Sequence, residues 1–131
     1  MNSEEITRML TKIFDASGKY SKGAIFAGVF AKNRLPTNFP HDKPCLLVAN
    51  TDDHRKPGEH WVAIFIEADR RYAEYFDSFG ESPLKEFEDY MSTYADRIVC
   101  NEKQIQSVAS KFCGHYTIMF CAFRAIGCNV H

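Results

Sequence analysis

The sequence predicts an α+β fold in a single domain over residues 1–131, with a small, mainly antiparallel sheet packed between helices. Two segments, one at the N-terminus and one over residues 84–95, carry apolar residues at helical spacing. Between them, the runs "HWVAIFIEA" and "RYAEYFD" are rich in β-branched and aromatic residues and meet at Asp69-Arg70, the pattern of a hairpin. A hydrophobic fraction of 45% is sufficient for one sizeable core in a chain of this length.

The first and last elements are expected to be helices of different kinds. In "NSEEITRMLTKIFDASG", Asn2 and Glu5 have the spacing of a capping box, and Gly18 suits the end of a helix. The apolar stripe of this helix consists of Ile6, Met9, Leu10, Ile13 and Phe14. The final run, residues 113–126, is apolar nearly all round, which predicts a buried helix that ends at Gly127.

The segments between these helices are expected to be short strands, loops and one further helix. Residues 19–43 are rich in Gly, Pro and Asn and predict an ordered loop with at most short strands. "CLLVAN" (45–50) suits a buried strand, "RIVC" (97–100) a further short strand, and "NEKQIQSVASK" (101–111) a polar connection. The helix predicted over 84–95 has its apolar positions at Leu84, Phe87, Tyr90, Met91 and Tyr94.

Composition and charge argue against several classes of function. Sixteen basic and seventeen acidic residues give a net charge of −1, so the chain has no global field that would recruit nucleic acid. No apolar run approaches the ~20 residues that a membrane helix needs. The N-terminal segment "MNSEEITRML" lacks the basic flank and apolar centre of a signal peptide. The expectation is therefore a soluble, intracellular protein with no membrane partner.

The cysteines are candidates for chemistry. The chain has five of them, at positions 45, 100, 113, 121 and 128. The odd number and the absence of a CxxC pair argue against a disulfide framework and a four-thiolate zinc site. A catalytic cysteine must be a thiolate, and a helix N-terminus with a nearby histidine lowers its pKa. Cys113 lies where the polar connection gives way to the final helix, and Gly114 leaves room for a substrate backbone. Cys113 is therefore the candidate nucleophile.

A base for this thiol should come from a rigid element near the start of the helix. His60 opens the strand "HWVAIF", whereas the other histidines lie in loops, near the terminus or two residues from Cys113. A hairpin centred near residues 68–69 pairs His60 roughly with Asp77, which ends the partner strand in "YFDSFG". The Asp77 carboxylate can then reach the imidazole and orient it. Without His60 opposite, Asp77 would be interpreted as a residue that caps a turn.

An acyl-transfer site also needs donors for the developing oxyanion. The backbone N–H of Cys113 at the helix N-terminus is one candidate. Gln106, in the polar connection just upstream, can supply a side-chain NH2 as the second donor. Gln104 is an alternative candidate for this role. The sequence also fits the simpler interpretation that Gln106 is a solvated loop residue without a catalytic role.

Taken together, these residues resemble a known family. "EHWVAIFIEADRRYAEYFDSFG" followed by "QSVASKFCGHYTIMFC" is similar to the adenovirus-type (adenain-like) cysteine proteases, relatives of the ubiquitin-like-protein-specific proteases. That family has His-Trp at a strand start, an acidic residue 17 positions on within Phe-acid-x-Phe-Gly, then Gln, then Cys-Gly opening a buried helix. His60-Trp61, Asp77, Gln106 and Cys113-Gly114 follow in that order, with Gln106 seven positions before Cys113. The resemblance covers roughly residues 24–125.

The resemblance implies a thiol endopeptidase that uses His60, Asp77, Gln106 and Cys113, without a cofactor or metal ion. Proteases of this type occur in adenoviruses and virus-like mobile elements, where they mature capsid precursors, and relatives typically cut after Gly. The resemblance therefore implies a polypeptide substrate, a monomeric enzyme, and a place in the host nucleus or cytoplasm or inside virions. The adenovirus enzyme is activated by a disulfide-linked peptide and by DNA. Here Cys100 follows "DRIV" rather than "DR", and the net charge is −1, so neither activator is carried over.

Three alternatives remain at this stage. The same fold can remove a ubiquitin-like protein from its conjugates instead of processing a precursor. It can also serve as a binding module that recognises such a polypeptide tail without cutting it. A metal site made of Cys113, His115 and Cys121 is a third possibility, although these positions have poor spacing for metal ligands.

Overall fold

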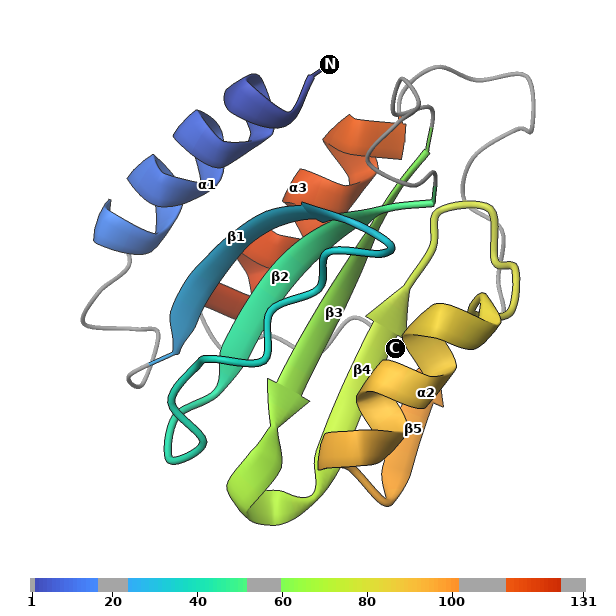
Figure 1. The fold of residues 1–131 in the computed structure, drawn as a ribbon. Helices are drawn as coiled ribbons and strands as arrows, with labels where there is room; N and C mark the ends of the chain where they lie inside the picture. Colours follow the sequence, from blue (N-terminus) through green and yellow to red (C-terminus); the bar gives the residue numbers. More distant parts are fainter. Residues whose placement is uncertain (1, 17–23, 52–59, 102–112, 126–131) are drawn as a thin grey trace.

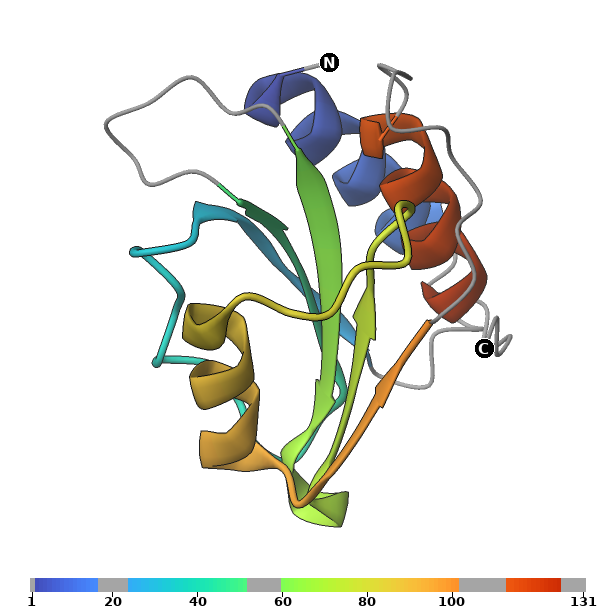
Figure 2. The ribbon, with the colours of Figure 1, turned by 90° about the vertical axis from the view of Figure 1, so that its right-hand side faces the viewer.

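The computed structural model describes residues 2–16, 24–51, 60–101 and 113–125 (Figure 1). One five-stranded sheet, in the order β1-β2-β3-β4-β5, lies between α1 and α3 on one face and α2 on the other (Figures 1 and 2). The elements are α1 (Ser3–Ala16), β1 (Ile25–Ala31), β2 (Cys45–Asn50), β3 (Trp61–Glu67), the 3-10 turn η1 (Ala68–Arg70), β4 (Tyr72–Phe76), α2 (Lys85–Tyr94), β5 (Arg97–Cys100) and α3 (Cys113–Ala125).

The sheet is mixed, so the expectation of a mainly antiparallel sheet is wrong. β2 pairs with β3 and β3 with β4 in antiparallel fashion, but β1–β2 and β4–β5 are parallel. Parallel neighbours need a crossover connection, and α2 provides it between β4 and β5. The order of elements is as predicted, and the α+β class holds, but strand direction depends on how these long connections return to the sheet.

β1 lies in the segment for which the composition predicts an ordered loop with at most short strands. It runs over Ile25–Ala31, and all seven residues are only partly buried because β1 lies at the edge of the sheet. Gly28 has φ 134° and marks a shift in the pairing register with β2. This bulge at a glycine weakens the strand pattern in the sequence, and pairing with β2 makes the segment a strand nonetheless.

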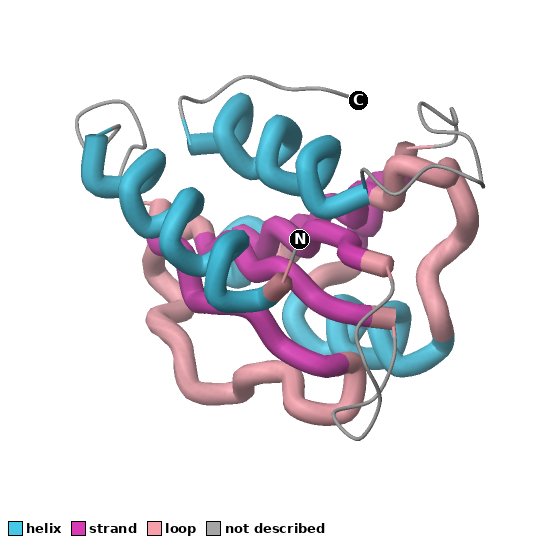
Figure 3. The backbone as a smooth tube through the Cα atoms, turned by 90° about the horizontal axis from the view of Figure 1, so that it is seen from above, coloured by secondary structure: helices cyan, strands magenta, loops and turns pink. Residues whose placement is uncertain are grey.

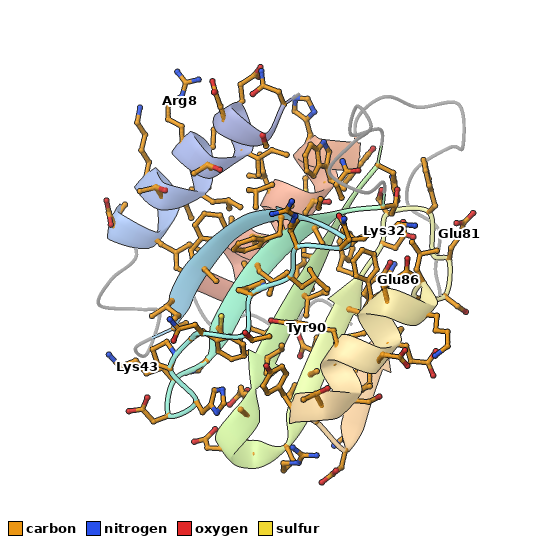
Figure 4. All side chains as sticks on the ribbon, in the orientation of Figure 1. Arg8, Lys32, Lys43, Glu81, Glu86 and Tyr90 are labelled. Carbon is orange, nitrogen blue, oxygen red and sulfur yellow. The ribbon has the colours of Figure 1, made fainter. Side chains whose placement is uncertain are left out.

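The loop from 32 to 44 is held against α2 by two side-chain contacts. Lys32 forms an ion pair with Glu86 at 3.1 Å, and the hydroxyl of Tyr90 donates a hydrogen bond to the carbonyl of Pro36. Figure 4 shows Lys32 and Glu86 side by side and Tyr90 projecting from α2. Through these two contacts the loop lies against α2 on the side of the helix nearer to β1.

Two hydrophobic cores lie on the two faces of the sheet. The side chains of β3 alternate between them, so Trp61, Ala63 and Phe65 face α1 and α3 while Val62, Ile64 and Ile66 face α2. Both faces are covered, which explains why β2 and β3 are buried along nearly their whole length. Burial of each large apolar side chain contributes about 1.5–3 kcal/mol. The two layers therefore hold β3 and β4 rigidly.

The β3–β4 hairpin exists as predicted, with η1 at its turn, but its register differs from the expected one. Ala63 pairs with Phe76, and extension of this register places residue 60 opposite residue 79 rather than opposite Asp77. Arg71, with φ 52°, adopts the left-handed conformation that closes the turn. This three-residue 3-10 turn and its left-handed closing residue move the pairing by two positions. Any contact between His60 and Asp77 is therefore diagonal across the strands.

The three helices are close to their predicted positions. α1 is capped by Asn2, whose side-chain oxygen accepts a hydrogen bond from the Glu5 amide at 2.9 Å. α3 packs beside α1 on one side of the sheet, as seen from above in Figure 3. α3 is not buried all round, because His115 and Met119 are exposed while Thr117, Ile118, Phe120 and Cys121 are buried. Among the described residues, no helix is long and apolar enough to cross a membrane.

Candidate active site

His60 and Asp77 lie at the same end of the sheet, on neighbouring strands. His60 directly precedes β3, and its carbonyl accepts a hydrogen bond from the Thr51 amide at 3.0 Å. Asp77 directly follows β4. Their side chains are 13% and 3% exposed, so both polar groups are withdrawn from bulk water. Two buried strands thus position a histidine and a carboxylate beside each other.

The two side chains are joined by a short hydrogen bond. His60 Nε2 lies 2.6 Å from Asp77 Oδ1, so the contact predicted from the hairpin exists, although across the diagonal. A carboxylate only accepts hydrogen bonds, so Nε2 donates and the other ring nitrogen, Nδ1, is left to exchange a proton. Bonds of this kind between a ring N–H and a carboxylate are among the stronger ones in proteins. The contact therefore fixes both the tautomer and the orientation of the ring.

Phe79 supports the same pair from two directions. Its backbone N–H donates to Asp77 Oδ1 at 2.9 Å, the oxygen that also accepts from His60. Its ring stacks on the imidazole of His60, with centroids 4.2 Å apart and planes at 6°. The tight turn that makes this possible is closed by the Gly80 amide, which donates to the Asp77 carbonyl at 2.8 Å, and Gly80 has φ 71°. The carboxylate and one face of the imidazole are thus held by a single short segment.

Asn101, which follows β5, holds the main chain of Asp77. Its Oδ1 accepts from the Asp77 N–H at 2.8 Å, and its Nδ2 donates to the Asp77 carbonyl at 2.6 Å. The sequence patterns predict no role for Asn101 or for the ring of Phe79. The Asp-x-Phe spacing was a local signal for Phe79. Asn101 lies 24 positions from Asp77 and gave no such signal.

Cys113 is the first residue of α3, as the sequence predicts. Thr117, one helical turn later, donates from its hydroxyl to the Trp61 carbonyl at 3.0 Å in the buried interior. This bond ties α3 to β3 at the residue next to His60. α3 therefore begins at the end of the sheet where β3 starts and β4 ends (Figures 1 and 2). The side chain of Cys113 and the whole of Gln104 and Gln106 lie outside the described residues.

Two of the other described cysteines, Cys45 and Cys121, are poor candidates for a thiolate. Cys45 and Cys121 are fully buried and Cys100 is partly buried, and none of the three forms a disulfide among the described residues. Burial raises the pKa of the Cys45 thiol to about 12. The pKa of the Cys121 thiol is also raised far above its usual range, chiefly by burial. At neutral pH both thiols stay protonated, which leaves them unreactive.

The metal-site alternative is not supported by the placement of its residues. His115 is exposed on α3, whereas Cys121 is completely buried in the core. Two side chains on opposite sides of a helix cannot bind one ion. Within the part of the chain that the structure describes, no group of three or more His, Cys, Asp or Glu residues is placed to hold a metal.

Comparison with known proteins identifies the fold as that of a viral protease. Two crystal structures of the ASFV pS273R protease are similar to this chain. One, of the selenomethionine form, matches with a TM-score of 0.65 and 18% identity over 98% of this chain. The other matches with a TM-score of 0.51 and 23% identity over 73% of this chain. The chain spans 59% and 36% of the lengths of those two structures. No protein-family model and no curated protein sequence matches.

Proposed function

We propose that this protein is a thiol peptidase in which Cys113 is the nucleophile, His60 the base and Asp77 the group that orients the base. The observation that carries the proposal is the 2.6 Å bond between His60 Nε2 and Asp77 Oδ1 at the end of the sheet where Cys113 begins α3. The shared fold with the ASFV protease supports it. So does the resemblance of the His60-Trp61, Asp77 and Cys113-Gly114 motifs to the adenovirus-type enzymes.

In this mechanism Nδ1 of His60 takes the proton of the Cys113 thiol. The thiolate attacks the carbonyl carbon of the scissile peptide bond, and the imidazolium returns the proton to the leaving amine. A water molecule, deprotonated by His60, then hydrolyses the thioester and releases the acid product and the free thiol. Asp77 accepts from the Nε2–H throughout and stabilises the imidazolium that forms in each step.

The negative oxygen that develops at the scissile carbonyl needs two donors. The backbone N–H of Cys113 at the start of α3 is one, because the first N–H groups of a helix have no partner within the helix. The side-chain amide of Gln106 is the second in this proposal. Its basis is the interval of seven positions to Cys113 that this sequence shares with the adenovirus-type enzymes.

The proposed substrate is a polypeptide cut after Gly, with a viral or virus-like capsid precursor favoured over a ubiquitin-like conjugate. The likeness to a viral protease supports the first choice. Gly114 directly after Cys113 leaves room for a substrate backbone to approach the nucleophile. The enzyme is proposed to act as a monomer, without a peptide or DNA activator, inside the infected or host cell.

Labelling with an electrophile directed at active-site thiols tests the nucleophile and base together. We expect stoichiometric modification of Cys113 near neutral pH, mapped by mass spectrometry, and loss of rapid labelling in His60→Ala. His115→Ala is the matched control, because His115 is close to Cys113 in sequence but exposed on α3. It should label like the wild type. Equal labelling of wild type and His60→Ala would remove His60 as the base.

Cleavage of a peptide library by the same preparation separates the enzyme from a binding module. The peptidase predicts new N-termini that follow Gly, produced by the wild type and not by Cys113→Ala. Binding of the peptides by both proteins, without any cleavage product, would instead identify a recognition module. Incubation with a ubiquitin-like precursor and with a capsid precursor distinguishes the two classes of substrate.

A further inference from the structure

The β4–β5 ladder ends just before Asp77, and neither the sequence motifs nor the fold explains how the main chain of Asp77 is held there. The parallel ladder ends at the pair Tyr75 and Cys100, and the last backbone contact is the Asn101 N–H to the Tyr75 carbonyl at 3.4 Å. Asp77 lies beyond this end, at the point where the chain turns away toward Gly80. A strand end of this kind leaves the N–H and carbonyl of its next residue without a partner on the neighbouring strand.

The side chain of Asn101 supplies that partner. A carboxamide has the same donor and acceptor groups as a peptide unit, and here both are used on one residue. Oδ1 accepts from the Asp77 N–H at 2.8 Å while Nδ2 donates to the Asp77 carbonyl at 2.6 Å. A primary amide carries its C=O and an N–H on the same side, so this one side chain bonds both main-chain groups of the residue that follows β4.

We propose that Asn101 is a positioning residue for the reaction: it holds the main chain of Asp77 so that the carboxylate stays aligned with His60. This inference rests on the proposed function, since it assigns Asn101 to the same site. With Asn101 in place, the Asp77 N–H and carbonyl and its Oδ1 all have partners within the protein. Without it, the Gly80 amide is the remaining partner of the Asp77 main chain among the described residues.

The link also connects the site to an edge strand. Within the described sheet, β5 has four residues and lies at the edge beside β4, so Asn101 follows a short edge strand rather than a central one. Replacement of Asn101 by Ala removes both bonds to Asp77 and leaves the carboxylate of Asp77 chemically intact. The expected result is a misaligned base and not an absent one.

The first measurement is steady-state cleavage by Asn101→Ala. We expect kcat to fall about tenfold to a hundredfold, with KM within about twofold of the wild type, because a displaced base affects the chemical step and not peptide binding. The second measurement is the low-field proton NMR signal of the His60 Nε2–H, assigned by its absence from His60→Ala. That signal should be lost or move upfield in Asn101→Ala.

Asp96→Ala is the matched control at the other end of the same strand pair. The Arg71 guanidinium donates to the Asp96 carboxylate at 2.9 Å, and the Asp96 amide donates to the Arg71 carbonyl at 2.9 Å. Truncation there removes a side-chain link next to β5 without contact to Asp77. For Asp96→Ala we expect the kcat of the wild type and an unchanged low-field signal, even if the thermal stability changes slightly.

The results separate positioning from simple support of the fold. A kcat loss in Asp96→Ala equal to that in Asn101→Ala would overturn the proposal, since both would then reflect a loosened β5. Unchanged kcat and signal in Asn101→Ala would overturn it as well. Should the wild type cleave no peptide, the proposed function fails by itself, and the NMR signal still decides whether Asn101 aligns Asp77 with His60.

Discussion

At each end of the β3–β4–β5 part of the sheet, an aspartate carboxylate accepts a short hydrogen bond from a nitrogen-bearing side chain, and the two pairs differ in their surroundings. At one end, His60 and Asp77 lie 2.6 Å apart with side chains 13% and 3% exposed. At the other, Arg71 and Asp96 lie 2.9 Å apart with side chains 47% and 75% exposed. An exposed pair is screened by water and loses side-chain entropy, so it contributes little. A withdrawn pair held by further hydrogen bonds has one geometry, which is the property that a base needs.

The number of supporting contacts differs as much as the burial. Asp77 receives bonds from His60, Phe79, Gly80 and Asn101, whereas the Asp96 carboxylate is bonded by Arg71. Each supporting bond removes one way in which the carboxylate could turn. The bonds at the His60 end therefore hold the Asp77 carboxylate in one orientation. At the other end, Arg71 closes the hairpin turn, and its bond to Asp96 stays exposed to water.

Asp77→Asn should produce the largest effect. The amide can present an N–H to the imidazole and so favours the wrong tautomer, and it cannot stabilise an imidazolium. We expect kcat to fall on the order of 10⁴-fold with the fold unchanged by circular dichroism. Activity close to that of the wild type would show that Asp77 only caps the turn, and the His60–Asp77 pair would then have no more than a structural role, like the Arg71–Asp96 pair.

Cysteine alkylation compares the reactivity of Cys113 at the proposed site with that of the buried cysteines in the core. Cys113 should react with iodoacetamide orders of magnitude faster than Cys45 or Cys121 at pH 7, because it is proposed to be a thiolate beside His60. With its pKa raised to about 12 by burial, Cys45 has about one thiol in 10⁵ ionised at that pH. Its labelling should increase only as the pH approaches 12 or the protein unfolds. Uniform rates, followed by mass spectrometry, would contradict the assignment of Cys113.

Gln106→Ala should lower kcat about 10²- to 10³-fold with little change in KM, since an oxyanion donor acts mainly in the transition state. Gln104→Ala is the matched control in the same connection and should be nearly silent. Steady-state kinetics on one peptide compares the two variants directly. If Gln104→Ala instead shows the large loss of kcat, the interval of seven positions has assigned the wrong glutamine.

Phe79→Ala tests the stacking contact separately from the amide bond, because the backbone N–H to Asp77 remains. We expect kcat to fall about tenfold as the imidazole gains freedom, and stability to fall by about 0.5–1.5 kcal/mol, the value of an aromatic pair. Phe26→Ala, which removes a stacked pair with Phe14 away from the site, is the control. It should lower stability by denaturant titration and leave kcat unchanged.

Asp96→Ala should have the smallest effect. Its hydrogen bond to Arg71 holds the pKa of the Asp96 carboxyl below its usual range. Such a group stabilises the fold above its unfolded pKa, and the contribution is lost as the pH falls through the lower, folded value. Thermal melts should therefore show a slight loss of stability at neutral pH and none at strongly acidic pH. A large loss at neutral pH would mean that the exposed pair is as important as the buried one.

Several features of this protein follow from local patterns in its sequence. The helices α1 and α2, the strand β2 and the hairpin turn follow from periodicity and turn residues, because these signals act over a few positions. The start of α3 at Cys113 belongs with them, since the change from polar to apolar residues marks it. The meeting of His60 with Asp77 follows from the hairpin. Their catalytic roles, and those of Cys113 and Gln106, remain predictions.

Other features were decided by the tertiary structure. The parallel pairing of β1 with β2 and of β5 with β4 depends on how long connections return to the sheet. The two-position shift in the hairpin register depends on the 3-10 turn that closes it. Which side of α3 is buried and which is exposed depends on how the helix packs against α1 and the sheet. Asn101 reaches Asp77 across 24 positions only because β5 pairs with β4. No local pattern encodes such a contact, since it exists only once the strands have assembled and their ends leave a peptide group to be satisfied.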